Sequence, residues 1–362
     1  MYDPSIIVHN KPSLSEEEVE AIAKPIQSNW VASGPITKIF QKEFSEYISG
    51  RSSQRLSFAC SNGTSALFLA LIAIDIHPGD EIIIPSYTCS ALLNAINMCG
   101  GKAVLCDSQV DNPNPSKDEI SKKVSALTKA IIVTHSFGIP SPVIEISTLG
   151  IPIIEDCCQA LGTIINGKKT GNFSSIAVYS FFASKMITTG NGGMISTTNP
   201  VFAQRIEDYL DFDGRLEYKH RFNLQFSDLQ AAMGRVQLEK LPSFILKRKN
   251  HAQAYIKILI GSRNLSYFHE TTDEEFNHYR FILKFQSFES LLIAKNFFLH
   301  KGIQSILPVE KFELLHTYLA QDPKDFPNAE KFAATCLSIP VYPALQEEES
   351  RRIENALIEL IS

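Results

Sequence analysis

Short apolar runs alternate with stretches of helical spacing in the first half of the chain. Compact apolar runs predict buried strands, whereas apolar residues three and four positions apart predict helices. The predicted strands are residues 57–60, 81–85, 103–106, 130–134, 151–154 and 176–182, and helices are predicted at residues 13–26, 39–48, 65–74 and 90–98. This alternation indicates an α/β fold with a largely parallel, doubly wound sheet.

The pattern changes after about residue 241. Helices are predicted at residues 227–241 and 244–259, with a break at Pro242, because proline lacks the amide hydrogen that a helix interior needs. Beyond them, strands are predicted at residues 279–285 and 305–307, and helices at residues 289–301 and 347–361. Because 362 residues exceed what one core usually holds, we expect a large domain at residues 1–241. A small α+β domain with a linker helix, residues 242–362, is expected to cover its cleft.

Composition narrows the class of protein. An apolar fraction of 44% and a net charge of −5 are typical of a soluble globular protein and give no sign of nucleic-acid binding. No apolar run approaches the ~20 residues that span a membrane, and the first residues lack the features of a secretion signal. The seven cysteines show no CxxC spacing and the nine histidines are scattered. We therefore expect a cytoplasmic protein with reduced thiols and no metal site.

Two charged side chains follow neighbouring apolar runs in the central segment, residues 151–197. Asp156 comes directly after the strand at residues 151–154, and Lys185 follows the strand at residues 176–182. In open α/β sheets, ligands bind at the carboxyl ends of the strands. Alone, Asp156 is equally well explained as a helix N-cap, and a single lysine is usually exposed. An acid and an amine brought to one cleft suggest a site that handles carbonyl groups, with imine chemistry as the first candidate.

Pyridoxal 5'-phosphate needs such a pair, namely a lysine that forms a Schiff base and an acid at the ring nitrogen. Lys185 would supply the amine and Asp156 would keep the ring nitrogen protonated. Gln159 would share a face with Asp156 if a short helix follows the strand. A lysine that transfers protons needs a pKa below its usual ~10.4. The apolar flank at residues 179–182 is consistent with such a lowered pKa, through burial.

A turn rich in small polar residues lies upstream of this pair. Residues 61–64 read Ser-Asn-Gly-Thr and lead into the helix at residues 65–74. Free N–H groups at a helix start, with hydroxyls beside them, form an anion site, although serine and threonine also cap many helices. No GK[ST] follows, so the turn is not a Walker loop. Together with Asp156 and Lys185, it would give the cofactor phosphate a place to bind.

These segments resemble the DegT/DnrJ/StrS family of sugar aminotransferases, which has the aspartate-aminotransferase fold (fold type I). The resemblance lies in EDCCQALG, YSFFASK and TGNGGMIST of the central segment and in residues 61–71, 78–96 and 222–241. It covers most of the chain and is strongest at residues 13–241. It implies a large domain with a mixed, mostly parallel sheet flanked by helices, a small C-terminal α+β domain, and pyridoxal phosphate as cofactor.

The resemblance also implies roles for individual residues. Lys185 forms the internal aldimine and shuttles the proton, and Asp156 pairs with the ring nitrogen. Gln159 lies near the phenolic oxygen of the ring. The residues implied to hold the phosphate are Gly63, Thr64, Ser65 and Ser180. Asn223 reaches the phosphate in the neighbouring subunit, so a homodimer is expected.

Three positions depart from the family pattern. Cys89 stands where many members place an aromatic ring on the cofactor, and Tyr87 is a candidate to compensate. Phe182 replaces a frequent histidine or tyrosine, and Gln225 replaces a frequent arginine or lysine; both could bear on substrate choice. The basic loop at residues 213–221 is either a solvated loop or a contact for a substrate diphosphate.

From the resemblance we expect an aminotransferase that moves an amino group from an amino acid, glutamate by family analogy, to a nucleotide-linked keto sugar. One alternative is the same chemistry on a cyclitol or another small ketone. A second is a dehydratase, against which Lys185 argues, because relatives with that activity replace the lysine. A third is a non-catalytic regulator that retains the fold.

Overall fold

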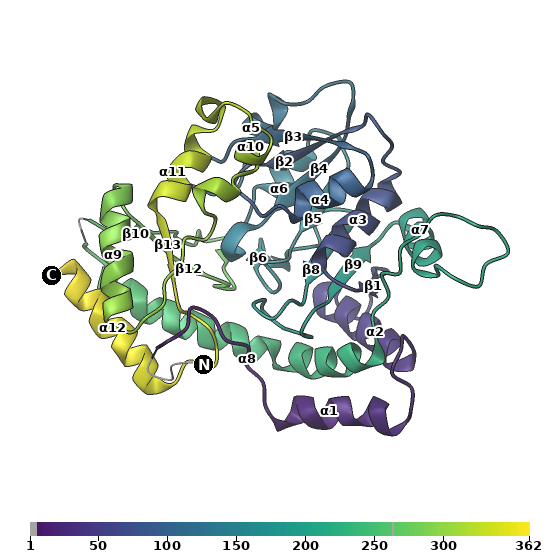
Figure 1. Cartoon of the computed structure of the whole chain (residues 1–362), viewed down its shortest axis with the longest axis horizontal. Coiled ribbons are helices and arrows are strands. Elements are labelled where there is room, and N and C mark those ends of the chain that lie inside the picture. The colour runs from purple at the N-terminus through teal and green to yellow at the C-terminus, as the bar shows by residue number, and fades with distance from the viewer. Residues whose placement is uncertain (1–5, 263) are drawn as a thin grey trace.

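A seven-stranded sheet organises the larger part of the molecule (Figure 1). The computed structural model describes residues 6–262 and 264–362. The strand order is β1 (Leu56–Cys60), β9 (Gly193–Thr197), β8 (Ile176–Ser180), β5 (Ile153–Asp156), β4 (Thr128–Thr134), β2 (Glu81–Pro85) and β3 (Lys102–Cys106). Only β9 runs antiparallel to its neighbours. The predicted mixed, mostly parallel sheet is therefore confirmed, while β9 itself was not among the predicted strands.

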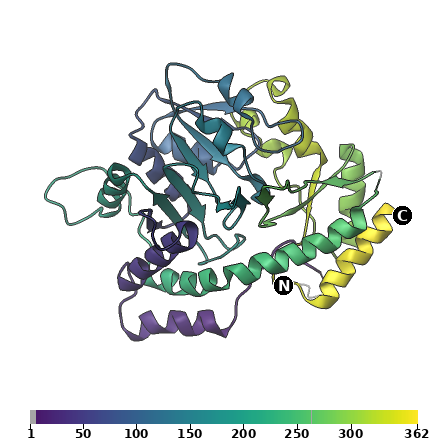
Figure 2. The same cartoon turned by 180° about the vertical axis from the view of Figure 1, so that it is seen from behind.

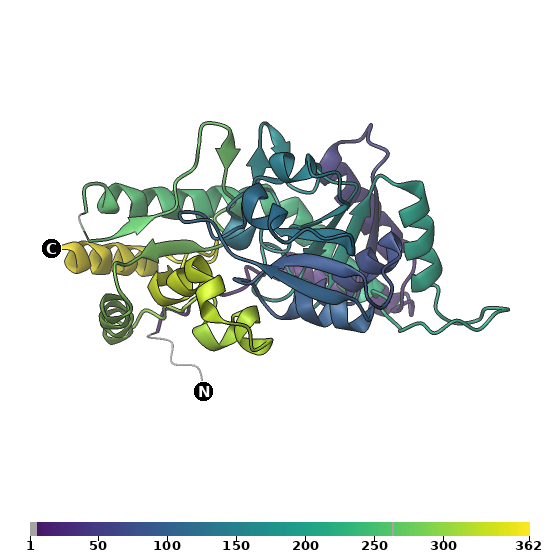
Figure 3. The same ribbon diagram turned by 90° about the horizontal axis from the view of Figure 1, so that it is seen from above.

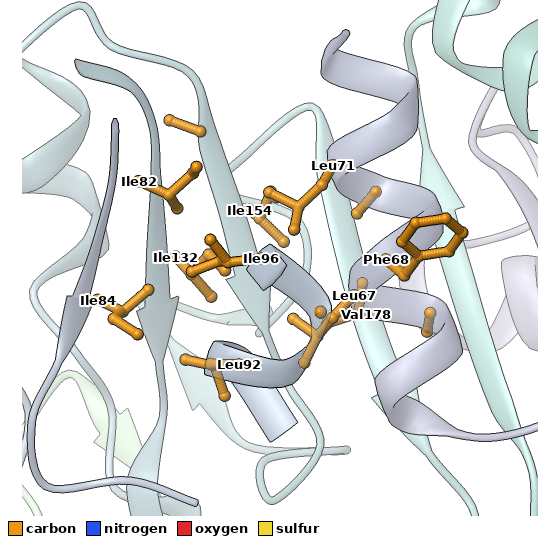
Figure 4. Close-up of a cluster of buried hydrophobic side chains, with 14 of the residues drawn as sticks. Leu67, Phe68, Leu71, Ile82, Ile84, Leu92, Ile96, Ile132, Ile154 and Val178 are labelled. Atoms are coloured by element: carbon orange, nitrogen blue, oxygen red, sulfur yellow. The ribbon is translucent and has the colours of Figure 1, made fainter. Parts of the chain in front are cut away.

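Helices cover both faces of this sheet. On one face, α3 (Gly63–Ile74) and α4 (Ala91–Met98) pack against the strands (Figure 4). Successive residues of a strand point to opposite faces, so Ile82 and Ile84 of β2 lie in this core, whereas Ile83 packs with α6 (Val143–Ser147) on the other face. Apolar residues on both faces explain why the strands read as continuous hydrophobic runs.

The helix α8 corrects one prediction. It runs without interruption over Asp228–Leu259, and Pro242 lies inside it. The two separate helices predicted at this point are therefore wrong. Pro242 is exposed, while Leu238, Leu241 and Phe244 are buried. Packing of the buried face outweighs the loss of one backbone hydrogen bond, a cost of ~3 kcal/mol in a helix interior.

A second sheet and a second core lie toward the C-terminus. The strands β10 (Ser266–Tyr267), β12 (Phe281–Lys284) and β13 (Cys336–Ile339) form the sheet, and α9 (Phe288–His300) and α12 (Glu347–Ile361) belong to its core. The strand predicted at residues 305–307 is wrong, because only Ile306 forms an isolated bridge, with Ser338. The C-terminal half of α8 also enters this core, so the predicted boundary at residue 241 falls within a continuous helix and stays a prediction.

The remaining elements lie around these two sheets. They are α1 (Glu16–Gln27), α2 (Pro35–Ser49), α5 (Lys117–Ser121), β6 (Ile164–Ile165), β7 (Lys168–Lys169), α7 (Pro200–Leu210), β11 (Glu274–Glu275), α10 (Leu315–Tyr318) and α11 (Pro327–Thr335). The helix α1 lies along the N-terminal half of α8, and the loop between α7 and α8 extends away from the body (Figures 2 and 3). No helix in the described part of the chain is long and apolar enough to cross a membrane.

Candidate active site

A cavity of about 360 Å³ opens at the carboxyl ends of β5 and β8. Its walls bring together Asp156 at the end of β5, Ser180 at the end of β8 and Lys185 in the following turn. The start of α3 contributes Asn62, Gly63 and Thr64, and the segment before β12 contributes Tyr279 and Arg280. The acid and the amine that the sequence pointed to therefore share one cavity.

Lys185 lies in a turn whose backbone forms two hydrogen bonds. Its backbone N–H donates to the carbonyl of Phe182 at 2.9 Å, and Asn10 Nδ2 donates to the carbonyl of Ser184 at 2.7 Å. The amine lies 5.3 Å from the ring centroid of Tyr279. The segment around Asn10 therefore crosses the backbone of the turn that carries the predicted catalytic lysine.

Burial acts to lower the pKa of Lys185, as expected from its apolar flank. The acidic groups of Tyr279, Cys158, Cys89 and Asp156 act in the other direction and outweigh burial, so that the pKa is raised. The expected lowering is therefore wrong for this arrangement of side chains, because the neighbours stabilise the charged amine.

Asp156 and Gln159 are oriented by backbone hydrogen bonds. Asp156 Oδ1 accepts a hydrogen bond from the Cys158 N–H at 2.9 Å, and this bond closes a turn. The described chain continues from β5 to β6 (Ile164–Ile165) without a helix, so the alternative of a helix N-cap at Asp156 is wrong. Gln159 Oε1 accepts from the Phe137 N–H at 2.7 Å. The carbonyl end of the Gln159 amide is thus held by the backbone, and its Nε2 donors remain for a group in the cavity.

The start of α3 forms a cradle for an anion. The first N–H groups of a helix have no partner within the helix, and those of Gly63 and Thr64 are at the cavity wall. A Cβ atom on Gly63 would lie 2.9 Å from Cβ of Ser180, so glycine is needed for this close approach. The cradle, the amine and the carboxylate fit the phosphate, the aldehyde and the ring nitrogen of pyridoxal phosphate.

Ser65 is engaged away from the cavity. Asn62 is the N-cap of α3, and its Oδ1 accepts from the Ser65 N–H at 2.8 Å. The Ser65 hydroxyl bonds Ser61 and Asn62, and Ser65 does not contribute to the cavity lining. Of the three residues predicted at this turn, Gly63 and Thr64 reach the cavity.

The positions that depart from the family pattern lie in different surroundings. Cys89 and Phe182 line the cavity. Tyr87 also lines it, and its ring packs against Phe137 and Phe332, with centroid distances of 5.9 and 5.7 Å. Which group lies against the cofactor ring stays a prediction. Gln225 is exposed and does not contribute to the cavity lining.

Asn223 and the basic loop lie outside the cavity lining. The Asn223 side chain is exposed, although the next residue, Leu224, accepts a hydrogen bond from the Ser61 N–H at 2.9 Å. In the loop, Arg215, Lys219 and Arg221 form ion pairs with Asp208. A contact of these three with a substrate diphosphate stays a prediction.

A buried polar network supports the end of β5 beneath the cavity. His135 Nε2 lies 3.2 Å from Glu155 Oε1, and His135 Nδ1 accepts from the Ser141 N–H at 3.0 Å. Glu155 also accepts from the N–H groups of Gly171 and Phe173. Burial acts to raise the pKa of Glu155, but the hydrogen bonds from His135 and the backbone outweigh it and lower the pKa. His135, Glu155 and Cys157 form a group with metal-ligand spacing. The hydrogen bonds explain His135 and Glu155 as structural residues, of which His135 also lines the cavity.

Tyr279, Arg280 and Asn191 are cavity residues that sequence reasoning missed. Tyr279 and Arg280 directly precede β12, and the run that contains them was predicted only as a strand. No local motif marks them, because they reach the cavity through the packing of the C-terminal segment against the larger sheet. Asn191 lies in the glycine cluster at residues 190–193, so its position was a usable signal.

An α/β sheet with an amine, a carboxylate and an anion cradle at its carboxyl edge defines the class, a pyridoxal-phosphate-dependent aminotransferase. The chain belongs to the DegT/DnrJ/EryC1/StrS aminotransferase family, whose family model matches residues 12–358. The resemblance drawn from the sequence motifs is confirmed.

Relatives with named functions match along nearly the whole chain. The dTDP-4-dehydro-2,3,6-trideoxy-D-glucose 4-aminotransferase of Saccharopolyspora spinosa is 30% identical, over 95% of this chain and 94% of that protein. The GDP-perosamine synthase of Escherichia coli O157:H7 is 31% identical, over 94% of both chains. Among solved structures, the aminotransferase TlmJ from Streptoalloteichus hindustanus is 26% identical and superposes with a TM-score of 0.91, over 98% of both chains.

Proposed function

We propose that this enzyme transfers an amino group from an amino acid, glutamate in the first instance, to the ketone of a nucleotide-linked sugar. Relatives at 30% and 31% identity, matched along nearly their whole length, support this acceptor class, since their names specify a dTDP-linked dehydro sugar and a GDP-linked amino sugar. The observation that carries the proposal is the convergence of Lys185, Asp156 and the start of α3 on one cavity.

The cofactor, when bound, supplies an aldehyde that accepts the amino group and a ring that withdraws electrons from the reacting carbon. Lys185 would hold it covalently and then move a proton between the two carbons that exchange the amine. Asp156 would keep a positive charge on the ring nitrogen, and Gln159 would donate to the phenolic oxygen. Gly63, Thr64 and Ser180 would bind the phosphate with backbone N–H groups and hydroxyls.

The proposal includes a homodimer in the cytoplasm. Asn223 is exposed on its own subunit, which suits a residue that serves the phosphate of a neighbour. The loop between α7 and α8 carries two fully exposed apolar side chains, Leu216 and Tyr218, which a second subunit would cover. All seven cysteines are free, and a cytoplasmic enzyme would keep them reduced.

The experiment begins with the cofactor. Purified enzyme loaded with pyridoxal phosphate should absorb visible light, and borohydride should fix the cofactor to Lys185 as a mass adduct. Lys185→Ala should remove the adduct and lower the turnover rate by about 10³-fold or more, since proton transfer by a placed group contributes roughly 10²–10⁴. Lys168→Ala, at the exposed first position of β7, is the matched control and should retain both properties.

A substrate panel then tests the acceptor. After glutamate has converted the cofactor to its amine form, dTDP-, GDP- and UDP-linked keto sugars are added, and amino-sugar products are sought by mass spectrometry. At least one nucleotide keto sugar should yield an amine. If only a cyclitol ketone included in the panel reacts, the nucleotide-sugar assignment is wrong and the aminotransferase assignment survives.

A further inference from the structure

Arg280 is a cation in the cavity wall, and two of the three nitrogens of its guanidinium are buried without a hydrogen-bond partner among the described residues. Its Nε and Nη1 are buried and form no hydrogen bond, and no carboxylate of the described residues pairs with it. Two buried arginines, Arg248 and Arg55, also have an Nε without a partner, but each donates through its Nη atoms. Arg248 donates to the carbonyls of Tyr279 and Val341, and Arg55 donates to those of Ser174 and Ser196. Buried donor atoms of a charged group are costly to leave without a partner, so Nε and Nη1 of Arg280 are in place for an anion that the cavity receives.

A second buried polar group on the same wall points to a ligand. Tyr87 is 1% exposed and lines the cavity, and its hydroxyl forms no hydrogen bond with the residues that the structure describes. The charge of Arg280 acts on this hydroxyl, because Arg280 opposes the rise that burial causes in the pKa of Tyr87. A ligand with acceptor oxygens would satisfy both groups at once.

The position of Arg280 restricts which anion this is. The ring of Tyr279 has the Lys185 amine at 5.3 Å from its centroid and the Arg280 guanidinium carbon at 5.4 Å. The guanidinium and the reacting amine therefore both lie against the ring of one tyrosine in the cavity wall. The cradle proposed for the cofactor phosphate lies on other elements, at the start of α3 and the end of β8.

We propose that Arg280 binds the α-carboxylate of the amino-acid donor and thereby sets the donor specificity of the enzyme. This rests on the proposed function, since it assumes an amino-acid donor. In an α-amino acid the carboxylate is one carbon from the reacting amine, which suits a guanidinium that lies against the same tyrosine ring as Lys185. In a nucleotide sugar, the sugar ring separates the diphosphate from the ketone. A planar guanidinium also matches a carboxylate with two parallel hydrogen bonds.

The test compares the two half-reactions in the holoenzyme. Arg280→Gln should raise the KM for glutamate roughly 10- to 100-fold, the worth of a charge-assisted hydrogen bond, and leave the KM for the keto sugar unchanged. Arg280→Lys should restore part of the loss, because it keeps the charge without the planar fork. Arg351→Gln is the control, since Arg351 is exposed on α12 and pairs with Glu347 on the same helix, and it should change neither constant.

A donor that lacks the α-carboxylate gives the sharper comparison. 4-Aminobutyrate is glutamate without that group, so wild-type enzyme should strongly prefer glutamate, and Arg280→Gln should lose most of the preference. Binding gives a readout without turnover. The pyridoxal form of the holoenzyme cannot transaminate 2-oxoglutarate, and its affinity for this acid by calorimetry should fall in Arg280→Gln, while melting temperature confirms that the variant is folded.

Two results would overturn the assignment in distinguishable ways. If wild-type enzyme uses glutamate and Arg280→Gln uses it equally well, or if the variant loses affinity for the keto sugar alone, Arg280 does not bind the donor carboxylate. If no amino acid converts the cofactor in wild-type enzyme, the proposed function fails, and the assignment fails with it.

Discussion

Tyr279 shows how neighbouring charges change a single side chain. Its ring is flanked by Lys185 and Arg280. Burial acts to raise the pKa of Tyr279, but Lys185 and Arg280, with smaller contributions from Ser184 and Arg248, lower it from 10 to about 8. The same interaction raises the pKa of Lys185. The phenolate and the ammonium therefore stabilise each other until the amine is used to hold the cofactor.

A pH titration tests this coupling. In cofactor-free enzyme, absorbance near 295 nm should reveal a tyrosine that ionises with a midpoint near pH 8. This transition should be absent in Tyr279→Phe. The lowered pKa of Tyr279 means that nearby cations favour its phenolate form, so removal of one of these cations must raise the pKa of Tyr279. Loading the cofactor or changing Lys185→Ala should therefore move the midpoint upward. Tyr218→Phe, in the exposed loop, serves as control and should leave the transition in place. A transition that persists in Tyr279→Phe would contradict this account.

At the scale of elements, α8 connects the two cores. Its N-terminal half packs with α2 and the larger sheet, and its C-terminal half packs with α12 and the smaller one (Figure 1). The helix begins with a capping box between Ser227 and Gln230, which satisfies two of its first N–H groups. Buried residues follow at helical spacing on both sides of Pro242, so the packed face continues through the proline.

Replacing Pro242 should therefore stabilise the protein. Pro242→Ala restores the amide hydrogen that can bond the carbonyl of Leu238, and part of the gain is offset because proline also restricts the unfolded chain. We expect the free energy of unfolding to rise by about 1–2 kcal/mol, measured as a higher urea midpoint at unchanged slope. Turnover should stay the same. Pro327→Ala is the matched control, because Pro327 is at the first position of α11, where proline is well tolerated, and no gain is expected there.

For the molecule as a whole, the question is whether one subunit completes the site of another. Asn223 lies outside the lining of its own cavity, in the segment between α7 and α8. The proposed dimer would bring it to the phosphate in the partner. Each site would then contain Lys185 from one chain and Asn223 from the other.

Mixed dimers test this directly. Asn223→Asp should weaken cofactor binding by roughly tenfold or more, since a carboxylate beside a phosphate replaces a donor with a repulsive charge. Lys185→Ala is inactive for a different reason. When the two variants are unfolded, mixed and refolded together, part of the activity should return, because heterodimers would contain one site with both native residues. Recovery of no activity, with heterodimers present, would show that Asn223 serves its own subunit or no site.

Most of the sheet could be predicted from the pattern of side chains along the chain. Strands buried on both faces are apolar at every position, and helices that cover them repeat every three to four residues. Asp156, Lys185, Gly63 and Thr64 follow these elements directly in sequence, so their convergence could be expected from the rule that ligands bind where parallel strands end. The strand β9 was not predicted, because a glycine cluster, which is typical of a loop, leads directly into it.

Other features depend on residues that are distant in sequence. Arg280 and Tyr279 reach the cavity only because the C-terminal segment packs against the larger sheet, and no local pattern carries that information. The continuity of α8 through Pro242 was decided in the same way, by packing on its buried face. The direction of the Lys185 pKa shift was also decided by folding, because burial and neighbouring charge act in opposite directions and only the spatial arrangement sets which is larger. Local propensity thus determined the elements and the amine–carboxylate pair, whereas long-range packing determined the cavity wall and its charges.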